Sequence, residues 1–311
     1  MSATPSDIPE IPPTPPKAPP RRLRRALLLF VALALVLAGL FLVRPARSLA
    51  RYTRDAIGAV QDSSRVRRLS KGNYTNLIFL HHSTGENLIQ QGLLRERLGA
   101  HGLTLWDHGY NAQGLRDPGG NPTGYSYNIP DDNTDPEGLA RLFNQRRIPL
   151  PLNALSGLLQ HEVVIFKSCF DPTSRIESDE KLVAYKEAYY QVRLGIQRHP
   201  ETLFILLTQP PLNPAETDPA QAARARALAD WLVSPEFQGG VDNLVVFDLF
   251  DQLAEGDPNA PDANMLRADY RTLGDSHPNR LANERVAPQL ADFIVQAVQA
   301  FRQRRAASPT E

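Results

Sequence analysis

The sequence is poor in cysteine: Cys169 is the only one among 311 residues. A single cysteine excludes an internal disulfide framework and any metal site built from several cysteines, but it leaves the redox compartment open. The chain also has no excess of either charge, because 34 basic residues balance 34 acidic ones. This balance gives no electrostatic reason to expect nucleic acid as a partner. The remaining composition, 42% hydrophobic and 22% charged, is that of an ordinary globular protein.

The N-terminal segment divides into a polar tail and a long apolar run. Residues 1–25 are rich in proline and end in Arg21-Arg-Leu-Arg-Arg25, which predicts a disordered, basic tail. Residues 26–43 are uninterruptedly apolar and would span about 27 Å as a helix, close to the ~30 Å hydrocarbon core of a bilayer. The apolar core of a secretory signal is shorter, about 7–15 residues. We therefore predict an uncleaved transmembrane anchor.

Basic residues flank this apolar run on both sides, so the positive-inside rule favours a cytoplasmic N-terminus only slightly. In that orientation the protein is a single-pass protein of the cell membrane, and its main domain lies outside the cytoplasm. Residues 44–72 are basic, with apolar positions at helical spacing, and predict a juxtamembrane stalk.

Beyond the stalk the pattern predicts one α/β domain over residues 73–304, followed by a disordered end at 305–311. Buried-strand candidates are Leu77–Leu80, Leu103–Trp106, Val163–Phe166, Leu203–Leu207 and Leu244–Phe247. Helical patterns fall near 86–98, 135–145, 178–197, 219–233 and 280–303. Strands that alternate with helices favour a parallel sheet covered on both faces, in three α/β/α layers.

The segment 107–134 interrupts this regular pattern. It is rich in Gly, Pro, Asn and Asp and carries tyrosines at positions 110, 125 and 127. A polar loop of this length in a compact domain is usually a binding loop or a lid. We expect its tyrosines to shape a substrate pocket.

The stretch 76–89 predicts a strand that breaks sharply into a helix, with Ser83 at the break. A serine there lies beside the free N–H groups and the positive end of the helix dipole, where a nucleophile and an oxyanion could both be stabilised. The same residue fits an ordinary helix cap, because Ser83 and Glu86 have the spacing of a capping box. The stretch alone leaves both interpretations open.

Polar side chains follow the ends of the predicted strands, and these ends share one edge of a parallel sheet. A further polar segment, Gly274-Asp275-Ser276-His277-Pro278, stands just before the last predicted helix. A histidine placed there, with an acid beside it, could reach Ser83 after the first strand. The components of a nucleophile, a base and an orienting acid are therefore present.

With these residues in place, residues 75–303 resemble the SGNH, or GDSL-type, serine hydrolases, which are esterases on a flavodoxin-like sheet. Ser83 stands where that family has its nucleophile, and Asp275-Ser-His277-Pro resembles its closing block. The resemblance implies a flavodoxin-like sandwich of about five parallel strands. It also implies Ser83 as nucleophile, His277 as base and Asp275 as orienting acid, with no metal and no cofactor.

The oxyanion donors that the resemblance implies are the N–H groups of Ser83 and Gly114. The family's third block falls at Ser168-Cys169-Phe170-Asp171, where Phe170 replaces an amide-bearing asparagine and cannot donate. Ser168, or backbone N–H groups at 168–170, would have to substitute. The closing acid is also two residues before His277 rather than three. The residues expected to line the pocket are His82, Asn111, Cys169 and Phe170.

Several of these residues have alternative interpretations. Adjacent His81 and His82 suggest a metal pair, but neighbouring side chains of a strand point to opposite faces. Asp107 and His108 could be ligands, although surface positions in a loop fit them better. Cys169 could be a nucleophile or a small buried group. Two further histidines precede strands and are expected to be exposed: His161 and His199. Asp248 could be the orienting acid or a helix cap.

The sequence therefore predicts a membrane-anchored serine hydrolase that cleaves an ester or acetyl group. An acylated glycan of the cell envelope is a reasonable substrate for a domain outside the cytoplasm. The same residues would also support acyl transfer. A rival of another class is a non-catalytic envelope-binding module in which Ser83 is retained as a helix cap.

Overall fold

The computed structural model describes residues 29–33, 49, 53–54, 56–61, 63, 66, 72–149 and 151–307. The chain divides into two compact units, residues 1–54 and residues 55–311. In the first unit residues 29–33 are helical, while the predicted tail and most of the predicted anchor lie outside the described residues. Among the residues described, none of the helices has both the length and the apolar character needed to cross a bilayer. All further description concerns the second unit.

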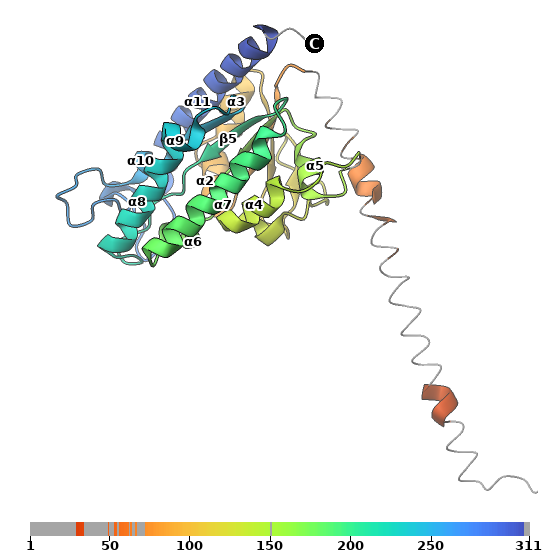
Figure 1. The fold of residues 1–311 in the computed structure, drawn as a ribbon, viewed down its shortest axis with the longest axis horizontal. Helices are drawn as coiled ribbons and strands as arrows, with labels where there is room; N and C mark the ends of the chain where they lie inside the picture. The colour runs from red at the N-terminus through yellow and green to blue at the C-terminus, as the bar shows by residue number, and fades with distance from the viewer. Residues whose placement is uncertain are drawn as a thin grey trace, which may run out of the picture. The chain divides into compact units, whose positions relative to one another are not determined.

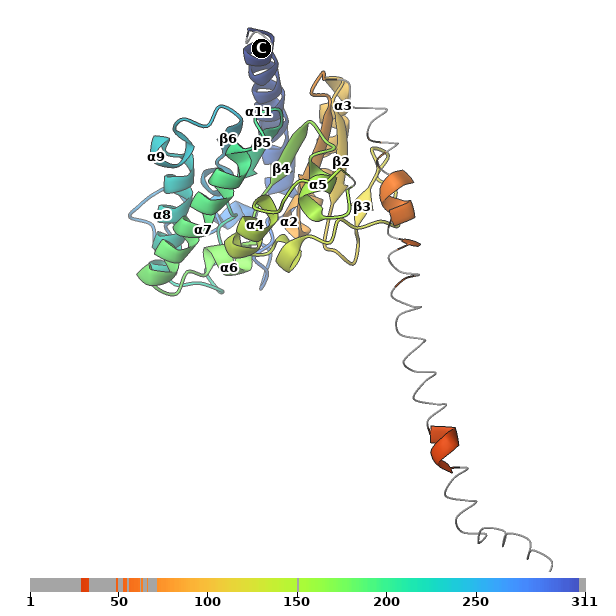
Figure 2. The same cartoon turned by 45° about the vertical axis from the view of Figure 1, so that its right-hand side comes forward.

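A six-stranded sheet forms the centre of this unit, in the order β3-β2-β1-β4-β5-β6. Its strands are β1 (Asn76–Leu80), β2 (Thr104–His108), β3 (Leu115–Arg116), β4 (Val163–Phe166), β5 (Leu203–Leu207) and β6 (Leu244–Phe247). All neighbours pair in parallel except β2 and β3. Without β3, the strands run second, first, third, fourth, fifth in chain order, which is the flavodoxin order. The five predicted parallel strands are thus confirmed, and β3 at the edge beyond β2 was not predicted (Figure 2).

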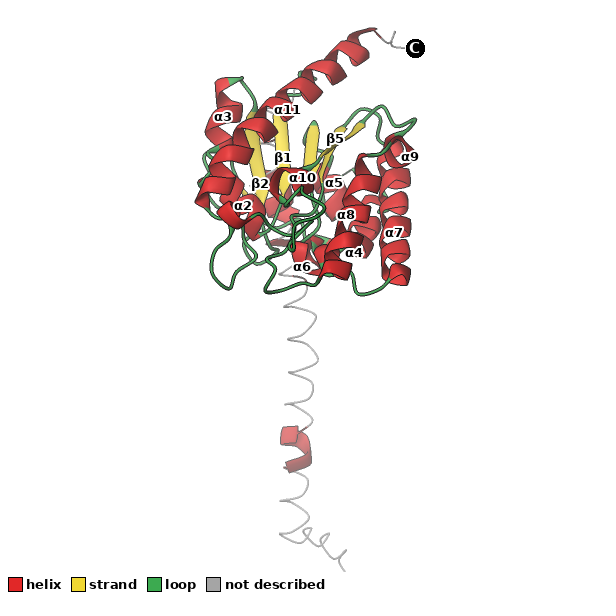
Figure 3. Cartoon of the chain, turned by 90° about the vertical axis from the view of Figure 1, so that its left-hand side faces the viewer, coloured by secondary structure: helices red, strands yellow, loops and turns green. Residues whose placement is uncertain are grey.

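Helices cover both faces of the sheet, which gives the expected three layers (Figure 3). On the face toward the viewer in Figure 1 lie α4 (Pro136–Phe143), α5 (Ala154–Leu158), α7 (Asp179–Gln197), α8 (Pro219–Val233) and α9 (Pro235–Gln238). On the opposite face lie α2 (Ser83–Gln90), α3 (Leu94–Ala100), α10 (Leu249–Leu253) and α11 (Arg280–Ala307). The short α6 (Phe170–Ser174) follows β4, and two 3-10 turns, η1 (Pro130–Asn133) and η2 (Ala268–Tyr270), complete the elements described.

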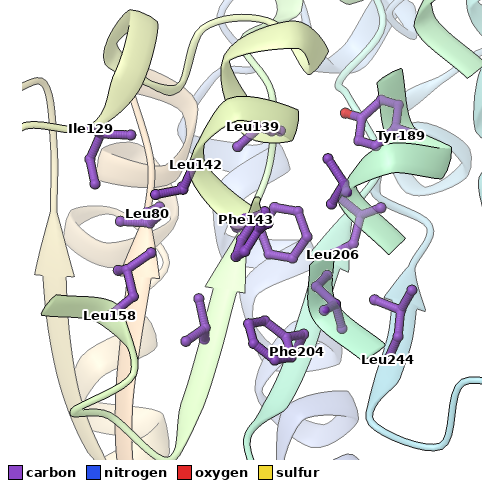
Figure 4. Close-up of a cluster of buried hydrophobic side chains, with 14 of the residues drawn as sticks. Leu80, Ile129, Leu139, Leu142, Phe143, Leu158, Tyr189, Phe204, Leu206 and Leu244 are labelled. Carbon is purple, nitrogen blue, oxygen red and sulfur yellow. The ribbon is translucent and has the colours of Figure 1, made fainter. Parts of the chain in front are cut away.

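The pleat of the strands divides the core into two apolar clusters, one on each face. In β1, Ile78 and Leu80 belong to the first cluster, whereas Leu77 and Phe79 belong to the second. Figure 4 shows the first cluster, in which Phe143 of α4 lies against side chains of the sheet. Its ring is 4.8 Å from that of Phe166 in β4. Burying such a side chain contributes about 1.5–3 kcal/mol to the free energy of folding. Packing on this face therefore holds the strands in place, together with the polar loops at their ends.

The helical pattern predicted over 86–98 is two helices rather than one. A Cβ atom on Gly92 would lie 2.3 Å from Cβ of Ala287, so only glycine allows α11 to pack this closely. The next residue, Leu93, takes the left-handed conformation (φ 57°) as the N-cap residue of α3, so the helical backbone is interrupted between α2 and α3. The helical spacing of apolar residues over 86–98 continues across this break between α2 and α3. The sequence therefore suggested a single helix.

The folded unit begins earlier, and its last helix ends later, than the sequence suggested. Ala59 and Val66, in the segment predicted as a stalk, are fully buried, and Val66 belongs to the first apolar cluster. At the other end, residues 305–307 are still helical in α11. Residues before 73 and after 304, which were expected to lie outside the domain, therefore belong to its packed core and to its last helix.

His161 and His199, which were expected to be exposed, are both buried. The Nε2 atom of His161 lies 3.1 Å from the hydroxyl of Tyr127 in the loop before η1. Burial lowers the pKa of His161 to about 3. The histidine is therefore neutral in the folded protein and joins the 107–134 loop to the start of β4.

The burial of His161 predicts that the folded protein is less stable at acid pH. The pKa of this histidine rises from about 3 to an ordinary 6.5 on unfolding, so protons bind the unfolded chain preferentially between these values. We expect the free energy of unfolding to fall as the pH drops below 6.5, by up to about 1.4 kcal/mol per pH unit from this residue. His161→Gln should show a shallower pH slope in urea unfolding from pH 7.5 to 4.5. The exposed His101→Gln should not, and equal slopes in wild type and His161→Gln would contradict the prediction.

Candidate active site

The polar segments meet at the carboxyl edge of the sheet, around β1 and β4. The strand order reverses here, because β1 lies between β2 and β4, and ligands of open α/β sheets bind at such a point. Ser83 is the first residue of α2, and His82 before it is the N-cap residue. The predicted capping box is wrong: no side chain caps α2, and the Glu86 carboxylate pairs with Arg116 at 2.7 Å.

Ser83, His277 and Asp275 lie in one hydrogen-bonded chain. The Oγ atom of Ser83 is 2.6 Å from Nε2 of His277. On the other side of the ring, Nδ1 of His277 is 2.5 Å from Oδ1 of Asp275. The first distance is within the range expected between a nucleophile and its base, about 2.6–3.2 Å. Residues separated by almost the whole domain are thus brought into contact.

The short spacing between Asp275 and His277 has a local explanation. The same Oδ1 atom of Asp275 accepts the backbone N–H of His277 at 2.9 Å as well as its ring N–H. A carboxylate two residues before the histidine can therefore reach the ring by bending back over its own turn. Partial burial acts to raise the pKa of Asp275, but the hydrogen bonds from His277 lower it below its ordinary value. The carboxylate is ionised near neutral pH.

The segment after β5 holds this loop in place. Asn213 donates from Nδ2 to the carbonyl oxygens of Thr272 and Asp275, at 3.2 and 3.1 Å. The buried Ser276 hydroxyl accepts the Asn213 backbone N–H at 3.0 Å and donates to Glu216 at 2.5 Å. This clamp fixes the residues on both sides of Asp275. No sequence motif pointed to Asn213 or Glu216, because their roles depend on contacts across about 60 residues.

Phe170 lies beside the base rather than near a donor position. Its ring meets the His277 ring edge to face, with centroids 5.1 Å apart and an interplanar angle of 88°. The contact covers one side of the imidazole with an apolar ring. Phe170 thus limits the orientations open to the His277 ring.

The expected oxyanion donors at Gly114 and Ser168 are already paired with other groups. The Gly114 N–H donates to the carbonyl of Tyr110 at 2.9 Å. The fully buried Ser168 hydroxyl accepts from Tyr189 at 2.9 Å and lies 2.9 Å from the Thr173 hydroxyl. The Cys169 N–H donates to a loop carbonyl at 2.9 Å. The Ser83 N–H, in the first turn of α2, belongs to the groups that have no intrahelical acceptor.

His82 and Tyr110 form the wall next to the nucleophile. Their rings stack with centroids 4.4 Å apart and an interplanar angle of 30°. Nε2 of His82 donates to the carbonyl of Asp132 at 2.5 Å. Burial, and secondly the positive charge of Lys167, lower the pKa of His82 to about 3, so its ring is neutral. Burial is the main cause that raises the pKa of Tyr110 above its ordinary value.

The loop that carries Tyr110 is tightly packed. Asn111, expected in the pocket, instead binds the loop itself: its Oδ1 accepts from the Ile129 N–H and its Nδ2 donates to the Ile129 carbonyl, both at 2.8 Å. Three consecutive residues, Asp131 to Asn133, have left-handed φ values of 48°, 55° and 63°. Such backbone is costly for residues other than glycine and persists where the surroundings impose it. Here it aims the Asp132 carbonyl at His82.

The other two tyrosines of this loop point elsewhere. Tyr125 donates its hydroxyl to the carbonyl of Pro151 at 2.8 Å. Tyr127 is buried against His161. Of the three tyrosines expected to shape a pocket, Tyr110 is the one whose ring stacks on His82, the residue before Ser83.

A buried charge network lies behind the nucleophile. Nε2 of His81 is 3.1 Å from Oδ2 of Asp107, and its Nδ1 is 2.9 Å from the carbonyl of His82. Arg95 pairs with the other oxygen of Asp107, and Arg116 is 3.7 Å from the same carboxylate. Burial acts to raise the pKa of Asp107, but the hydrogen bond from His81 and the charge of Arg95 lower it.

This network also bears on metal binding. Ligand atoms of His81, Glu86 and Asp107 lie within 4.8 Å of one another. Both carboxylates are paired with arginines, so a cation would have to displace two guanidinium groups. The rings of His81 and His82 bind different groups, the Asp107 carboxylate and the Asp132 carbonyl, which does not favour a metal ion shared between them.

The remaining candidates take structural positions. Asp107 and His108 were expected at the loop surface, but both are buried. Asp248 caps α10 by accepting the Asp251 N–H at 3.1 Å. Cys169 is the N-cap residue of α6 and is partly exposed. Burial lowers the pKa of Lys167, which follows β4, to about 8.

Comparison with known proteins finds no protein-family model and no curated protein that matches the chain. One similar solved structure is described as a "putative acylhydrolase" from Bacteroides fragilis NCTC 9343. It is 13% identical with a TM-score of 0.43, and the match covers 73% of this chain and 88% of that chain. Another is described as a "putative platelet activating factor" from Streptococcus pneumonia. It is 14% identical with a TM-score of 0.44, over 80% of this chain and 99% of that chain. Because both likenesses are remote, function has to be judged from the geometry of the site.

Proposed function

We propose that the protein is a serine hydrolase that cleaves an ester or acetyl group through Ser83, His277 and Asp275. The observation that carries this proposal is the 2.6 Å contact between Ser83 Oγ and His277 Nε2, with Asp275 bound to the opposite nitrogen. Asp275 accepts a hydrogen bond from Nδ1–H of His277, which leaves the Nε2 lone pair directed at the serine hydroxyl. Side chains placed in this way form a nucleophile, a general base and an orienting group.

The reaction would proceed in two halves. Ser83 Oγ attacks the carbonyl carbon while His277 Nε2 takes the hydroxyl proton, and a tetrahedral oxyanion forms. The bond to the leaving alcohol breaks, the imidazolium returns the proton to that oxygen, and an acyl-serine remains. Water then attacks the acyl carbon, His277 takes a proton from it, and collapse releases the acid and restores the Ser83 hydroxyl. The N–H of Ser83 at the positive end of α2 would stabilise the oxyanion.

The finer assignments are also proposals. Classification as an SGNH-type enzyme rests on the order of Ser83 and Asp275-Ser-His277-Pro along the chain. A membrane position with the domain outside the cytoplasm rests on the apolar run 26–43 and the basic residues before it. An acyl ester of an envelope glycan is the substrate class that this position favours.

Labelling with a fluorophosphonate probe tests the hydrolase proposal. The probe forms a covalent bond with an activated serine, so the wild-type protein should gain one adduct that maps to Ser83. Ser83→Ala should remain unlabelled, whereas Ser234→Ala, at the end of α8, should label as the wild type does. If wild type and Ser83→Ala behave alike, the protein is better described as a binding module on this fold.

A further inference from the structure

The peptide group between His82 and Ser83 carries the N–H that would stabilise the oxyanion in the proposed reaction. Its carbonyl accepts the backbone N–H of Glu86 at 2.9 Å, the first hydrogen bond of α2. The same carbonyl oxygen lies 2.9 Å from Nδ1 of His81. A trans peptide group is planar with its N–H opposite its carbonyl, so contacts that fix the carbonyl also fix the direction of the N–H.

We propose that His81 is a positioning residue of the hydrolase, which holds and polarises the peptide group that carries this oxyanion donor. The inference rests on the proposed function and adds a buried residue that acts through the backbone. A carbonyl oxygen has no proton to give, so Nδ1 of His81 donates and the His82 carbonyl accepts. A hydrogen bond to a peptide oxygen also strengthens donation by the N–H of the same peptide group.

The fold places His81 directly behind the nucleophile. Its side chain is 1% exposed and lies on the same side of the sheet as Phe79, two residues earlier, with ring centroids 5.3 Å apart. The first turn of α2 packs against it from the other direction. A Cβ atom on Gly85 would lie 2.2 Å from Cβ of His81, so only glycine allows the helix to begin this close to the histidine.

A carboxylate holds the other side of the His81 ring. Its Nε2 atom is 3.1 Å from Oδ2 of Asp107 and 3.8 Å from Oε2 of Glu86. Arg95 pairs with the first of these carboxylates and Arg116 with the second. Burial acts to raise the pKa of Asp107, but its hydrogen bond with His81 and the charge of Arg95 lower it, so it is an ionised acceptor. The imidazole cannot turn without breaking its contact with the carboxylate or with the peptide carbonyl.

Two substitutions of His81 test this role, because asparagine and leucine have nearly the same size and differ in the donor. In His81→Asn the amide nitrogen can take the place of Nδ1 and donate to the His82 carbonyl, whereas leucine has no polar atom. Both variants lose the contact with Asp107, so their comparison isolates the bond to the carbonyl. We expect kcat for p-nitrophenyl acetate to fall by about 10- to 100-fold in His81→Leu and to stay within about fivefold of wild type in His81→Asn.

Two further quantities distinguish positioning from packing. KM should stay within about twofold of wild type in both variants. Phenylboronic acid forms a tetrahedral anion on an active serine, so its inhibition constant should rise in His81→Leu by about the factor by which kcat falls. His199→Asn replaces a buried histidine before β5, at the opposite edge of the sheet, and should match the wild type in all three quantities. Circular dichroism shows whether each variant is folded.

The wild-type protein provides a test that needs no folded leucine variant. In ¹⁵N NMR of histidine-labelled protein at pH 7.5, Nδ1 of His81 should carry a proton, and its signal should be missing from His81→Asn. An unprotonated Nδ1 cannot donate to the His82 carbonyl and would overturn the proposal.

The outcomes separate this proposal from the proposed function. If Ser83→Ala is inactive and a folded His81→Leu protein keeps kcat and boronate inhibition within about threefold of wild type, His81 does not position the donor, but the hydrolase stands. A fall in kcat as large in His81→Asn as in His81→Leu, or a change confined to KM, would also overturn the proposal. If the wild type neither labels nor hydrolyses the ester, the hydrolase function fails, and the role of His81 fails with it.

Discussion

Replacing His277 with alanine should lower kcat by about 10⁴-fold or more, the scale of loss when a serine hydrolase loses its base. Without the imidazole, nothing at 2.6 Å can take the Ser83 proton as the hydroxyl attacks. The loss corresponds to at least about 5.4 kcal/mol of transition-state stabilisation. KM should change little, because His277 acts on the proton and contributes little to ground-state binding.

The measurement is steady-state hydrolysis of p-nitrophenyl acetate by purified variants. His101→Ala is the matched control, because this histidine is exposed at the end of α3 and should leave kcat unchanged. Circular dichroism and thermal melting show whether His277→Ala remains folded. A folded His277→Ala protein that keeps more than about a tenth of wild-type kcat would rule out His277 as the base.

Asp107→Ala should reduce the free energy of unfolding by about 3–5 kcal/mol, the usual cost of removing one partner from a buried ion pair. The carboxylate is fully buried and is the counter-charge for Arg95, with Arg116 3.7 Å away. It also accepts from His81, whose other nitrogen binds the carbonyl just before Ser83. Its loss would leave buried donors without an acceptor directly behind the nucleophile.

Thermal melting at pH 7.5 measures this effect, and a decrease in Tm of roughly 10 °C is expected for a domain of this size. Asp292→Ala removes an exposed carboxylate from the middle of α11 and should change Tm by less than about 2 °C. If the two variants melt at similar temperatures, the network contributes little to stability and its role behind Ser83 must be reconsidered.

The parallel strands were predictable because they are buried on both faces. Strands such as Leu77–Leu80 and Val163–Phe166 appear in the sequence as continuous apolar runs. A strand with one face in solvent would instead alternate apolar and polar residues and would be harder to recognise. The long helices α7, α8 and α11 were equally visible from their periodicity. Local pattern and tertiary packing agree in all of these elements.

Features that depend on distant contacts were not predictable. The break at Gly92 exists because α11 packs there, and His161 is buried because the 107–134 loop folds over it. β3 has two residues, too few to leave a pattern. In each case the deciding partner lies far away in the sequence.

The candidate site also contains residues that could be predicted from the sequence and contacts that could not. Ser83, Asp275 and His277 stand in motifs at element boundaries, so their types and positions could be read directly. The residues that hold them in place could not be predicted: Asn213 binds the closing loop through two carbonyl contacts that no local spacing encodes. The N–H of Gly114 and the hydroxyl of Ser168, which were expected as oxyanion donors, bind other groups instead.

The most direct test is the rate of p-nitrophenol release from p-nitrophenyl acetate by wild type and Ser83→Ala at equal concentration. If Ser83 is the nucleophile, the wild type turns over repeatedly and the variant is slower by about 10⁴-fold or more. Equal rates in the two proteins, or no turnover in either, would contradict a hydrolase centred on Ser83.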